Sequence, residues 1–401
     1  MRYHTNMKKT PSLGRTATKN NALTLLGGIS AEEFLKDYWH KKPLLVRNAI
    51  PGFSGLLSPD ELAGLACEED AQSRLISFKG KQWKVEQGPF NEDRFSQLPE
   101  RHWTLLLQEL NHHLQEAADL LGQFNFIPHA RLDDLMVSYA PDGGGVGPHF
   151  DSYDVFLLQG LGQRLWRISE QEDLSLVEGA PLRILKKFNT EEEWLLSPGD
   201  MLYLPPHVAH WGIAVGDCMT YSIGFRAPSA QEFGSEFLNY LQEHKALEGQ
   251  YRDPDLRLQD SPGEIEQAMI DKVHNMLEGL KWDIKDVADF LGHYLTEPKL
   301  HIVFDVPFEK LTLNDFKNNI AQSGIRLALK SQMMFTDTAI YLNGESIKTS
   351  PEDFALFKHL ANVRMLSASN CSLVLDKHQH LIELFYTWYQ AGYLIIAEKL
   401  Q

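Results

Sequence analysis

The sequence predicts an α+β protein with a β-rich first half, a helical middle and a mixed C-terminal part. Between residues 132 and 225, short apolar or aromatic runs alternate with Gly and Pro, which is typical of an all-β sandwich or barrel. Beyond residue 230, large apolar residues recur at helical spacing, and nearer the C-terminus helical patterns flank a hairpin signal. We therefore expect a disordered tail at 1–22, followed by domains at 23–229, 230–300 and 301–401.

Helix starts and strands can be placed in the first half. Ser30 with Glu33, and Ser58 with Glu61, have capping-box spacing, so a helix is expected after each serine. The expected strands are short and apolar or aromatic. They lie at Pro43–Val46, Leu135–Ala140, Val155–Gln159, Leu165–Ser169, Met201–Leu204 and Met219–Phe225.

The second half contains helices and one clear hairpin. Asn343-Gly344 is a strong turn signal between two short β-like runs. Helices are expected at Phe233–Leu241, after Ser261–Glu264, at Val287–Tyr294, after Ser350–Asp353 and at Leu381–Tyr389. Helices that flank a hairpin resemble a small winged-helix module. Because no basic recognition face is present, we expect a protein-contact or structural role and no direct DNA binding.

Composition restricts the class of protein. At 401 residues and 43% hydrophobic, the chain can bury a sizeable core, and its formal net charge of −16 disfavours general nucleic-acid binding. Acidic surface suits a basic protein partner, although it also serves solubility alone. The three cysteines are far apart, and no apolar run approaches the roughly 20 residues that span a membrane. We expect a cytoplasmic protein.

The main chemical signal is the segment Gly147-Pro148-His149-Phe150-Asp151. In a strand, His149 and Asp151 would project to the same face. An imidazole beside a carboxylate supplies two ligands of a 2-His-1-carboxylate facial triad, which binds Fe(II) and leaves positions open for cosubstrate and oxygen. A single His-x-Asp also arises by chance, so other features must support it.

A later segment offers the third ligand. Ser197 to Pro206 predicts a turn, a strand and a Pro-Pro stop, after which come His207 and His210. We favour His210, because it begins a strand-like run that would fix its orientation, whereas His207 lies in the turn. His207 remains the alternative.

An internal arginine completes the candidate site. Arg164 is expected on a strand that also carries Trp166 on the same face, and an arginine inside a barrel is costly unless it meets an anion. A guanidinium binds a carboxylate in a bidentate fork, as the distal carboxylate of 2-oxoglutarate would require. Ser222 shares a strand face with Thr220, and its hydroxyl is expected to bind the same carboxylate. The alternatives are a surface Arg164 packed on Trp166 and a purely structural Ser222.

Several motifs together resemble the JmjC-type ribosomal oxygenases, closest to the bacterial members. They are His149-x-Asp151…His210, the Pro-Gly-Asp-x-Leu-Tyr-x-Pro-Pro segment, the Gly-Phe-Arg-Ala-Pro end at 224–228, Trp39-His40-Lys41-Lys42-Pro43 and Gly88-Pro89-Phe90. The likeness covers nearly the whole chain. His207 and Ala209 depart from it, since a smaller residue and a proline are expected there.

The resemblance implies a double-stranded β-helix (cupin/JmjC) catalytic domain, a helical dimerisation region and a C-terminal winged-helix domain. It implies iron ligands at His149, Asp151 and His210, a 2-oxoglutarate site at Arg164, and O2 as the second cosubstrate. The bacterial members hydroxylate an arginine of a large-subunit ribosomal protein, so a homodimer that acts on a basic ribosomal protein is expected.

Substrate residues are sought on the strand that leads into the site. Asp133 or Asp134 could hold a substrate guanidinium, with Met136 or Tyr139 packed on its aliphatic stem. A turn followed by ordinary core is the competing interpretation. The other functions to exclude are a histidyl hydroxylase of a ribosomal protein and a non-catalytic metal-binding cupin scaffold.

Overall fold

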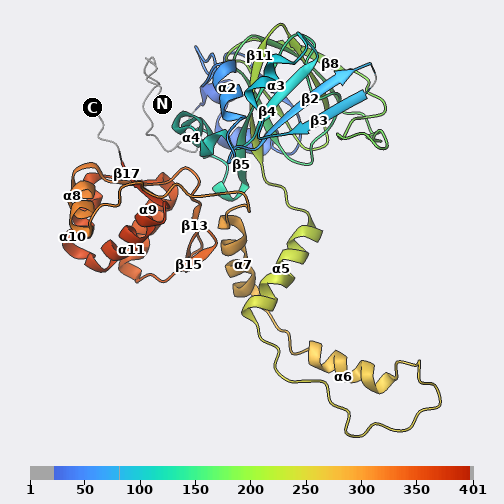
Figure 1. Ribbon diagram of the computed structural model, residues 1–401, viewed down its shortest axis with the longest axis vertical. Helices are drawn as coiled ribbons and strands as arrows, with labels where there is room; N and C mark the ends of the chain where they lie inside the picture. Colours follow the sequence, from blue (N-terminus) through green and yellow to red (C-terminus); the bar gives the residue numbers. More distant parts are fainter. Residues whose placement is uncertain (1–21, 81, 398–401) are drawn as a thin grey trace. The chain divides into compact units, whose positions relative to one another are not determined.

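The computed structural model describes residues 22–80 and 82–397 (Figure 1). The chain divides after Ala227 into two compact units, Met1–Ala227 and Pro228–Gln401. Apart from Ala22, the tail expected at 1–22 lies outside the described residues. Each unit has its own hydrophobic core.

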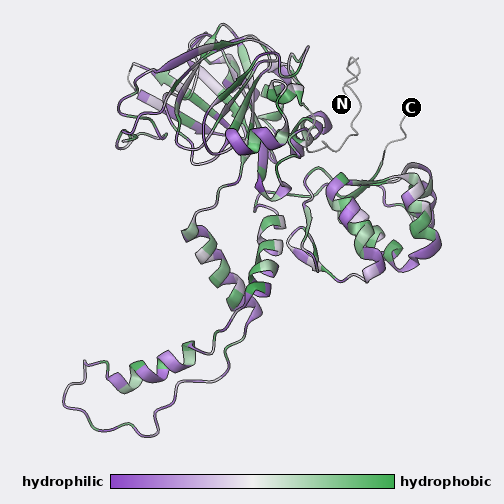
Figure 2. Ribbon diagram, turned by 180° about the vertical axis from the view of Figure 1, so that it is seen from behind, coloured by the Kyte–Doolittle hydropathy of each residue, from purple (hydrophilic) through white to green (hydrophobic). Residues whose placement is uncertain are grey.

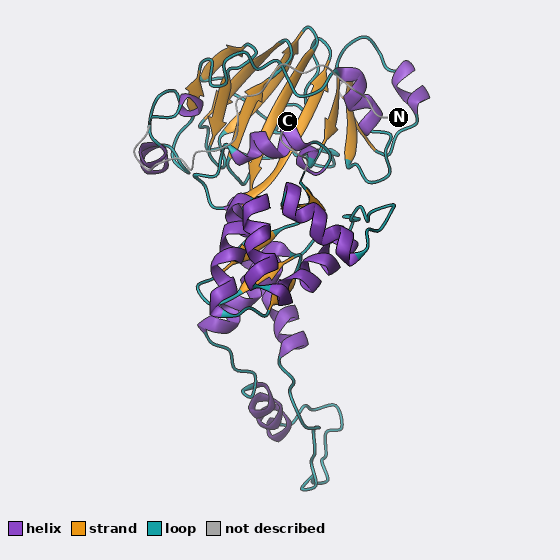
Figure 3. Cartoon of the chain, turned by 90° about the vertical axis from the view of Figure 1, so that its left-hand side faces the viewer, coloured by secondary structure: helices purple, strands orange, loops and turns teal. Residues whose placement is uncertain are grey.

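The first unit contains two antiparallel sheets, drawn as orange arrows in Figure 3. The larger sheet has the order β1-β9-β6-β11-β5-β4-β2-β3 and the smaller one the order β10-β7-β8. The strands of the larger sheet are β1 (Leu44–Val46), β2 (Ser73–Lys79), β3 (Gln82–Gln87), β4 (Trp103–Leu107), β5 (Leu132–Ala140), β6 (Val155–Gln159), β9 (Met201–Leu204) and β11 (Cys218–Phe225). Those of the smaller sheet are β7 (Gln163–Ser169), β8 (Glu192–Leu196) and β10 (Ala209–Val215).

The inner faces of the two sheets pack together. Leu157 and Leu202 of the larger sheet lie in one buried cluster with Trp166, Ile168 and Leu196 of the smaller sheet. Along β7, residues 164, 166 and 168 are buried while 163, 165 and 167 are only half-buried, which is the two-residue alternation of a strand with one inward face. The β-rich first half expected from the sequence is therefore confirmed.

Helices cover the outer face of the larger sheet. They are α1 (Ala31–Asp37), α2 (Pro59–Leu65), α3 (Glu92–Ser96) and α4 (Gln115–Gly122), with the short 3-10 turns η1 (Thr24–Leu26), η2 (Leu110–His112) and η3 (His129–Arg131). Phe34 of α1 is fully buried, with its ring centroid 4.9 Å from that of Tyr203 on β9. Both predicted helix starts are confirmed. The full capping box forms only at Ser58, whereas Ser30 accepts a hydrogen bond from Glu33 without the return bond.

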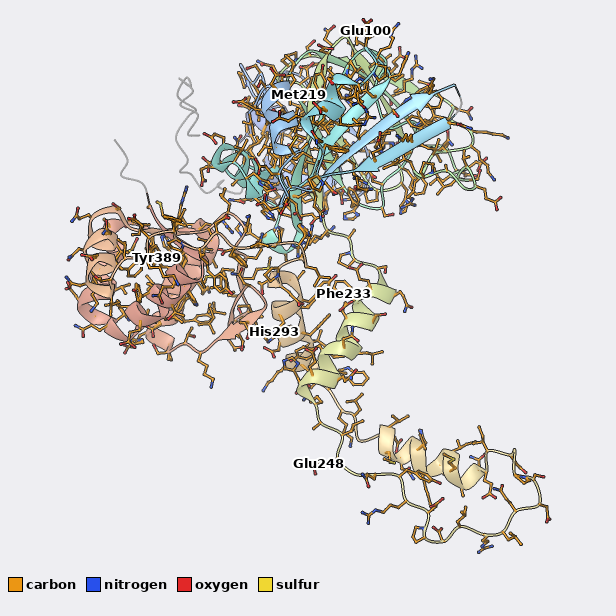
Figure 4. All side chains as sticks on the ribbon, viewed as in Figure 1. Glu100, Met219, Phe233, Glu248, His293 and Tyr389 are labelled. Atoms are coloured by element: carbon orange, nitrogen blue, oxygen red, sulfur yellow. The ribbon has the colours of Figure 1, made fainter. Side chains whose placement is uncertain are left out.

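A pair of helices begins the second unit. α5 (Ala230–His244) and α7 (Ile284–Thr296) contact each other through aromatic rings, with the centroids of Phe237 and Phe290 5.3 Å apart. In Figure 4, the labelled Phe233 and His293 lie on α5 and α7, and Glu248 lies on the irregular segment that follows α5. The segment that connects α5 to α7 contains α6 (Gln267–Leu277), which has no buried residue. The helix start expected at Ser261 is wrong: α6 begins six residues later, with Glu266 at its cap and no side-chain capping bond.

The remainder of the second unit is a winged-helix module. Its helices are α8 (Leu313–Ser323), α9 (Pro351–Val363), α10 (Ala368–Lys377) and α11 (Gln379–Gln390). Its strands are β12 (Ile325–Leu327), β13 (Met333–Phe335), β14 (Ile340–Leu342), β15 (Glu345–Ile347), β16 (Met365–Leu366) and β17 (Leu394–Ile396). Asn343-Gly344 forms the expected turn between β14 and β15, with both residues at positive φ. None of the helices in the described residues has the length and apolarity needed to cross a membrane.

Candidate metal and cosubstrate site

Three side chains meet at one end of the smaller sheet. The ligand atoms of His149, Asp151 and His210 all lie within 4.8 Å of one another, and no other such group of three or more occurs in the described part of the chain. His149 and Asp151 are not in a regular strand, contrary to expectation. Instead, a single bridge fixes the segment, since His149 and His210 exchange backbone hydrogen bonds of 3.0 and 2.7 Å.

Both imidazoles are oriented as ligands. The Nδ1–H of His149 donates to the Gly147 carbonyl at 2.9 Å, and that of His210 donates to the Val208 carbonyl at 2.9 Å. Because a carbonyl only accepts, each ring carries its proton on Nδ1 and leaves the Nε2 lone pair available for a metal. Nε2 of His210 lies 3.6 Å from Oδ2 of Asp151.

Burial keeps His210 neutral. It lowers the pKa of His210 to about 4, and the proximity of His149 adds to the effect, while the negative Asp151 opposes it. A neutral imidazole is the form that binds metal, so no proton must leave this ligand near neutral pH. His207 lies outside the group: it is exposed, at φ +67°, and its backbone N–H donates to the Asp151 carbonyl. His210, rather than His207, therefore joins the cluster.

Strand β7 carries the cationic part of the site. β7 pairs with β10 so that Ile168 faces His210 and Arg164 faces Ala214. Arg164 is only 4% exposed, and its Nε and one terminal nitrogen have no hydrogen-bond partner. A buried guanidinium with unsatisfied donors is costly, so the position is built for an anion. The alternative of a surface Arg164 is excluded by its burial, although its guanidinium does lie over the Trp166 ring at 5.8 Å.

The hydroxyls expected beside Arg164 lie on β11. Ser222 is 8% exposed and is the register partner of Met136 on β5 and of Leu157 on β6, so it shares their inward face. Thr220 lies two residues away on that face, but its hydroxyl donates to Gln159 at 3.1 Å. Because the Thr220 hydroxyl is engaged in this way, the Ser222 hydroxyl is the better placed of the two to bind a ligand.

The candidate substrate residues separate into two groups. Met136 is half-buried on the inward face of β5. Tyr139 is on the opposite face, where it packs against Trp103 in the outer core, so the structure does not bring it to the site. Side chains alternate between the two faces of a strand, so residues three positions apart lie on opposite faces. Met136 and Tyr139 therefore cannot contact the same substrate side chain.

The two aspartates also differ. Asp134 is 8% exposed, and its Oδ2 accepts a hydrogen bond from the backbone N–H of Glu109 at 2.9 Å, beside the start of η2. Asp133 is more exposed and lies 3.7 Å from Nε of Arg226. Asp134 therefore has a structural task, and Asp133 is the more exposed carboxylate of the two.

Sequence reasoning missed Tyr153, two residues after Asp151. The side chain is 40% exposed, yet burial of its hydroxyl raises the pKa of Tyr153, and the charges of Asp151, Asp134 and Asp133 raise it further. The phenol thus stays protonated among these carboxylates. An aromatic residue directly after a ligand segment was the available signal, but the chain offers many Tyr and Phe residues with ordinary core roles.

The donor set fits particular ligands. Two neutral imidazoles and one carboxylate on one side of a site are the protein ligands of non-haem Fe(II) oxygenases. The buried guanidinium on the same sheet fits the far carboxylate of a dicarboxylate that reaches the metal with its other end. A barrel of two facing sheets with this set at its end defines a metal-binding cupin of the JmjC class, and a JmjC domain family model matches residues 119–233.

Comparison with known proteins extends this match to most of the chain. A ROXA-like winged-helix family model matches residues 279–395. The E. coli ribosomal protein uL16 3-hydroxylase is 33% identical over 356 residues, which cover 88% of this chain and 94% of that protein. A probable ribosomal oxygenase of Haemophilus influenzae is 40% identical over 237 residues, 58% of this chain and 56% of that protein.

Solved structures agree. The X-ray structure of E. coli YcfD has a TM-score of 0.79 and 32% identity, covering 91% of this chain and 97% of that one. A structure of YcfD, a ribosomal oxygenase, in complex with cobalt and 2-oxoglutarate has a TM-score of 0.77 and covers 92% and 98%. The chain belongs to the JmjC-domain ribosomal oxygenases, and the fold expected from the sequence resemblance is confirmed.

Proposed function

We propose that this protein is an Fe(II)- and 2-oxoglutarate-dependent hydroxylase of a large-subunit ribosomal protein, with an arginyl side chain as its target. The observation that carries the proposal is the pairing of a neutral two-histidine, one-carboxylate group with the buried, unsatisfied Arg164. A scaffold that only binds metal has no need of a buried guanidinium. The E. coli relative, whose name states that it modifies uL16, supports the substrate class.

His149, Asp151 and His210 would hold the iron, and Arg164 with Ser222 would hold 2-oxoglutarate. When bound, iron, 2-oxoglutarate and O2 supply the oxidant for an unactivated carbon. The protein's own contribution is to orient the cosubstrate through Arg164, to keep His210 unprotonated and to exclude water from the apolar space between the sheets.

Two features support an arginyl target. The chain carries a formal net charge of −16, and the charge of Asp133, like that of the candidate ligand Asp151, raises the pKa of Tyr153. A guanidinium is planar and always charged, so the carboxylate of Asp133 can orient it. A histidine is neutral for much of the time near pH 7 and would gain less. We also propose, as the sequence led us to expect, that the protein does not bind DNA directly. Because the proposed substrate is a ribosomal protein, we propose a cytoplasmic location.

We also propose a homodimer formed through residues 230–300. Large apolar side chains are exposed here in unusual number for a water-facing segment. They include Leu238, Leu256, Leu258, Ile265, Met269, Ile270, Val273, Met276, Leu277, Trp282 and Ile284. Figure 2 shows green, hydrophobic segments alternating with purple ones along α6. A second copy of the chain would cover them.

The test uses peptides from a basic ribosomal-protein loop that contains arginine, with Arg replaced in turn by Lys and by His. Incubation with Fe(II), 2-oxoglutarate and O2, followed by mass spectrometry, should show a gain of about 16 Da, the mass of one oxygen atom, on the Arg peptide alone. Comparison of ribosomal proteins from cells with and without the gene identifies the natural target. Equal or better modification of the His peptide would move the protein to the histidyl hydroxylases. No modification and no succinate formation would favour a non-catalytic cupin.

A further inference from the structure

Strand β7 has a second buried donor without a partner. Trp166 is 5% exposed, and its indole nitrogen, like the guanidinium of Arg164, makes no hydrogen bond within the described part of the chain. Buried indole N–H groups are normally satisfied, because leaving such a donor unpaired forfeits its hydration. The two unsatisfied groups lie two residues apart on the same inward face.

The indole lies between the two halves of the site. Its ring centroid is 5.9 Å from that of His210, and the guanidinium carbon of Arg164 is 5.8 Å from the ring. A ligand that reaches from the metal group to Arg164 therefore passes beside Trp166. The ring also belongs to the apolar cluster that includes Leu157, so it can wall the methylene groups of such a ligand.

Gly212 on β10 sets the orientation of the ring. A Cβ atom at Gly212 would lie 2.7 Å from two carbons of the six-membered ring of Trp166 and 3.0 Å from a third. The face of the six-membered ring therefore packs directly on the glycine backbone, and only glycine permits this approach. The indole N–H lies in the plane of the ring, so the glycine backbone does not cover it.

We propose that the indole N–H of Trp166 donates a hydrogen bond to a carboxylate oxygen of bound 2-oxoglutarate. This inference rests on the proposed function and adds a cosubstrate-binding residue to it. A dianion is the ligand that satisfies both donors at once, and a bond from N–H to a charged oxygen is stronger than one to a neutral group. Trp166 thus contributes to affinity for the cosubstrate and holds it in one orientation.

The experiment measures 2-oxoglutarate binding by calorimetry on the full chain loaded with Co(II), without O2. Trp166→Phe removes the N–H and part of the ring. Incorporation of benzothienylalanine at position 166 removes the N–H and keeps the ring size, which covers the case in which Trp166→Phe fails to fold. Trp211→Phe is the matched control, because Trp211 is on β10 with its ring against Arg167 of β7, on the outward face.

Both changes at position 166 should weaken 2-oxoglutarate binding by roughly 10- to 100-fold, the range for a hydrogen bond to a charged group. Co(II) affinity without 2-oxoglutarate should stay unchanged, and so should both affinities of Trp211→Phe. The benzothienylalanine protein without ligands should melt no lower than the unaltered protein, since it has lost an unsatisfied donor. Unchanged 2-oxoglutarate affinity in that protein would overturn the inference alone. Failure of the unaltered protein to bind 2-oxoglutarate would overturn the proposed function as well.

Discussion

Replacing Arg164 with methionine removes the guanidinium and keeps most of the aliphatic stem. In the structure this side chain is 4% exposed and has two nitrogen donors without partners. A bidentate contact with a carboxylate would use both donors. A hydrogen bond to a charged group contributes about 1.5–3 kcal/mol. At 1.4 kcal/mol per factor of ten, Arg164→Met should weaken 2-oxoglutarate binding by roughly 10- to 150-fold.

The same substitution should stabilise the protein when no cosubstrate is bound. A buried guanidinium with unsatisfied donors is unfavourable, so its removal should raise the melting temperature of the ligand-free protein. Adding 2-oxoglutarate should then raise the melting temperature of the unaltered protein far more than that of Arg164→Met. The two measurements together distinguish a ligand-binding arginine from a structural one.

The assay follows the Michaelis constant for 2-oxoglutarate in succinate formation, together with the constant for the peptide. Arg167→Met is the control, because Arg167 lies on the same strand, faces outward and pairs with Glu193 at 2.7 Å. We expect the constant for 2-oxoglutarate to rise in Arg164→Met alone, with little change for the peptide. An unchanged constant for 2-oxoglutarate would place Arg164 outside the pocket and refute the reasoning.

Three further predictions concern the metal, the assembly and acid stability. Asp151→Ala should abolish succinate formation and lower Co(II) affinity without changing the circular dichroism spectrum; full activity would remove Asp151 from the metal site. Ile270→Glu, on the exposed face of α6, should convert a dimer to a monomer by light scattering, and a monomeric unaltered protein at micromolar concentration would contradict the proposed interface. Asp353 is buried; burial raises its pKa, but hydrogen bonds from Ser350, His380 and His378 outweigh this and lower it. Its contribution to stability is therefore present above the ordinary aspartate pKa and is lost as pH falls through the lower folded value. Asp353→Asn should reduce unfolding free energy near pH 7 by about 1–3 kcal/mol and flatten the acid limb of the melting curve; an unaltered acid limb would show that another group controls it.

Much of the site could be predicted because its chemistry is local in sequence. His149 and Asp151 are two residues apart, and the strand after the Pro-Pro stop brings His210 beside them. Arg164 was identifiable because it shares a strand face with Trp166, and a cation on an inward face demands an anion. For Arg164 and His210 a single strand fixes the direction of the side chain, so the spacing of residues carried enough information. His149 and Asp151 lie outside a regular strand, and the bridge to His210 fixes their segment instead.

Other features depend on contacts between distant segments. The role of Asp134 is set by the Glu109 backbone, 25 residues earlier, which no local pattern reveals. Met136 and Tyr139 were offered as alternatives, and strand alternation separates them without showing which face is turned to the site. The contact between Tyr139 and Trp103 places Tyr139 on the outer face. The strand β3 was missed because it has no buried residue and carries several polar ones, so its pattern does not stand out from that of a loop. At Ser261 the spacing of a capping box is present, but Pro262 and Gly263 form a turn instead.

The hydrogen bonds between β7 and β10 place His210 opposite Ile168 and Arg164 opposite Ala214. Slipping this ladder by one residue would turn Arg164 to the outer face, and slipping it by two would move the guanidinium by roughly 6–7 Å. The pairing of the strands allows no smaller shift of the backbone, so the distance between the metal site and the guanidinium of Arg164 is fixed. A dicarboxylate binds well only if its length matches that distance. The five-carbon 2-oxoglutarate should therefore bind better than its four-carbon and six-carbon homologues, oxaloacetate and 2-oxoadipate. Changing which of these the enzyme prefers would require a different side chain at position 164, rather than a shift of the strand that carries it.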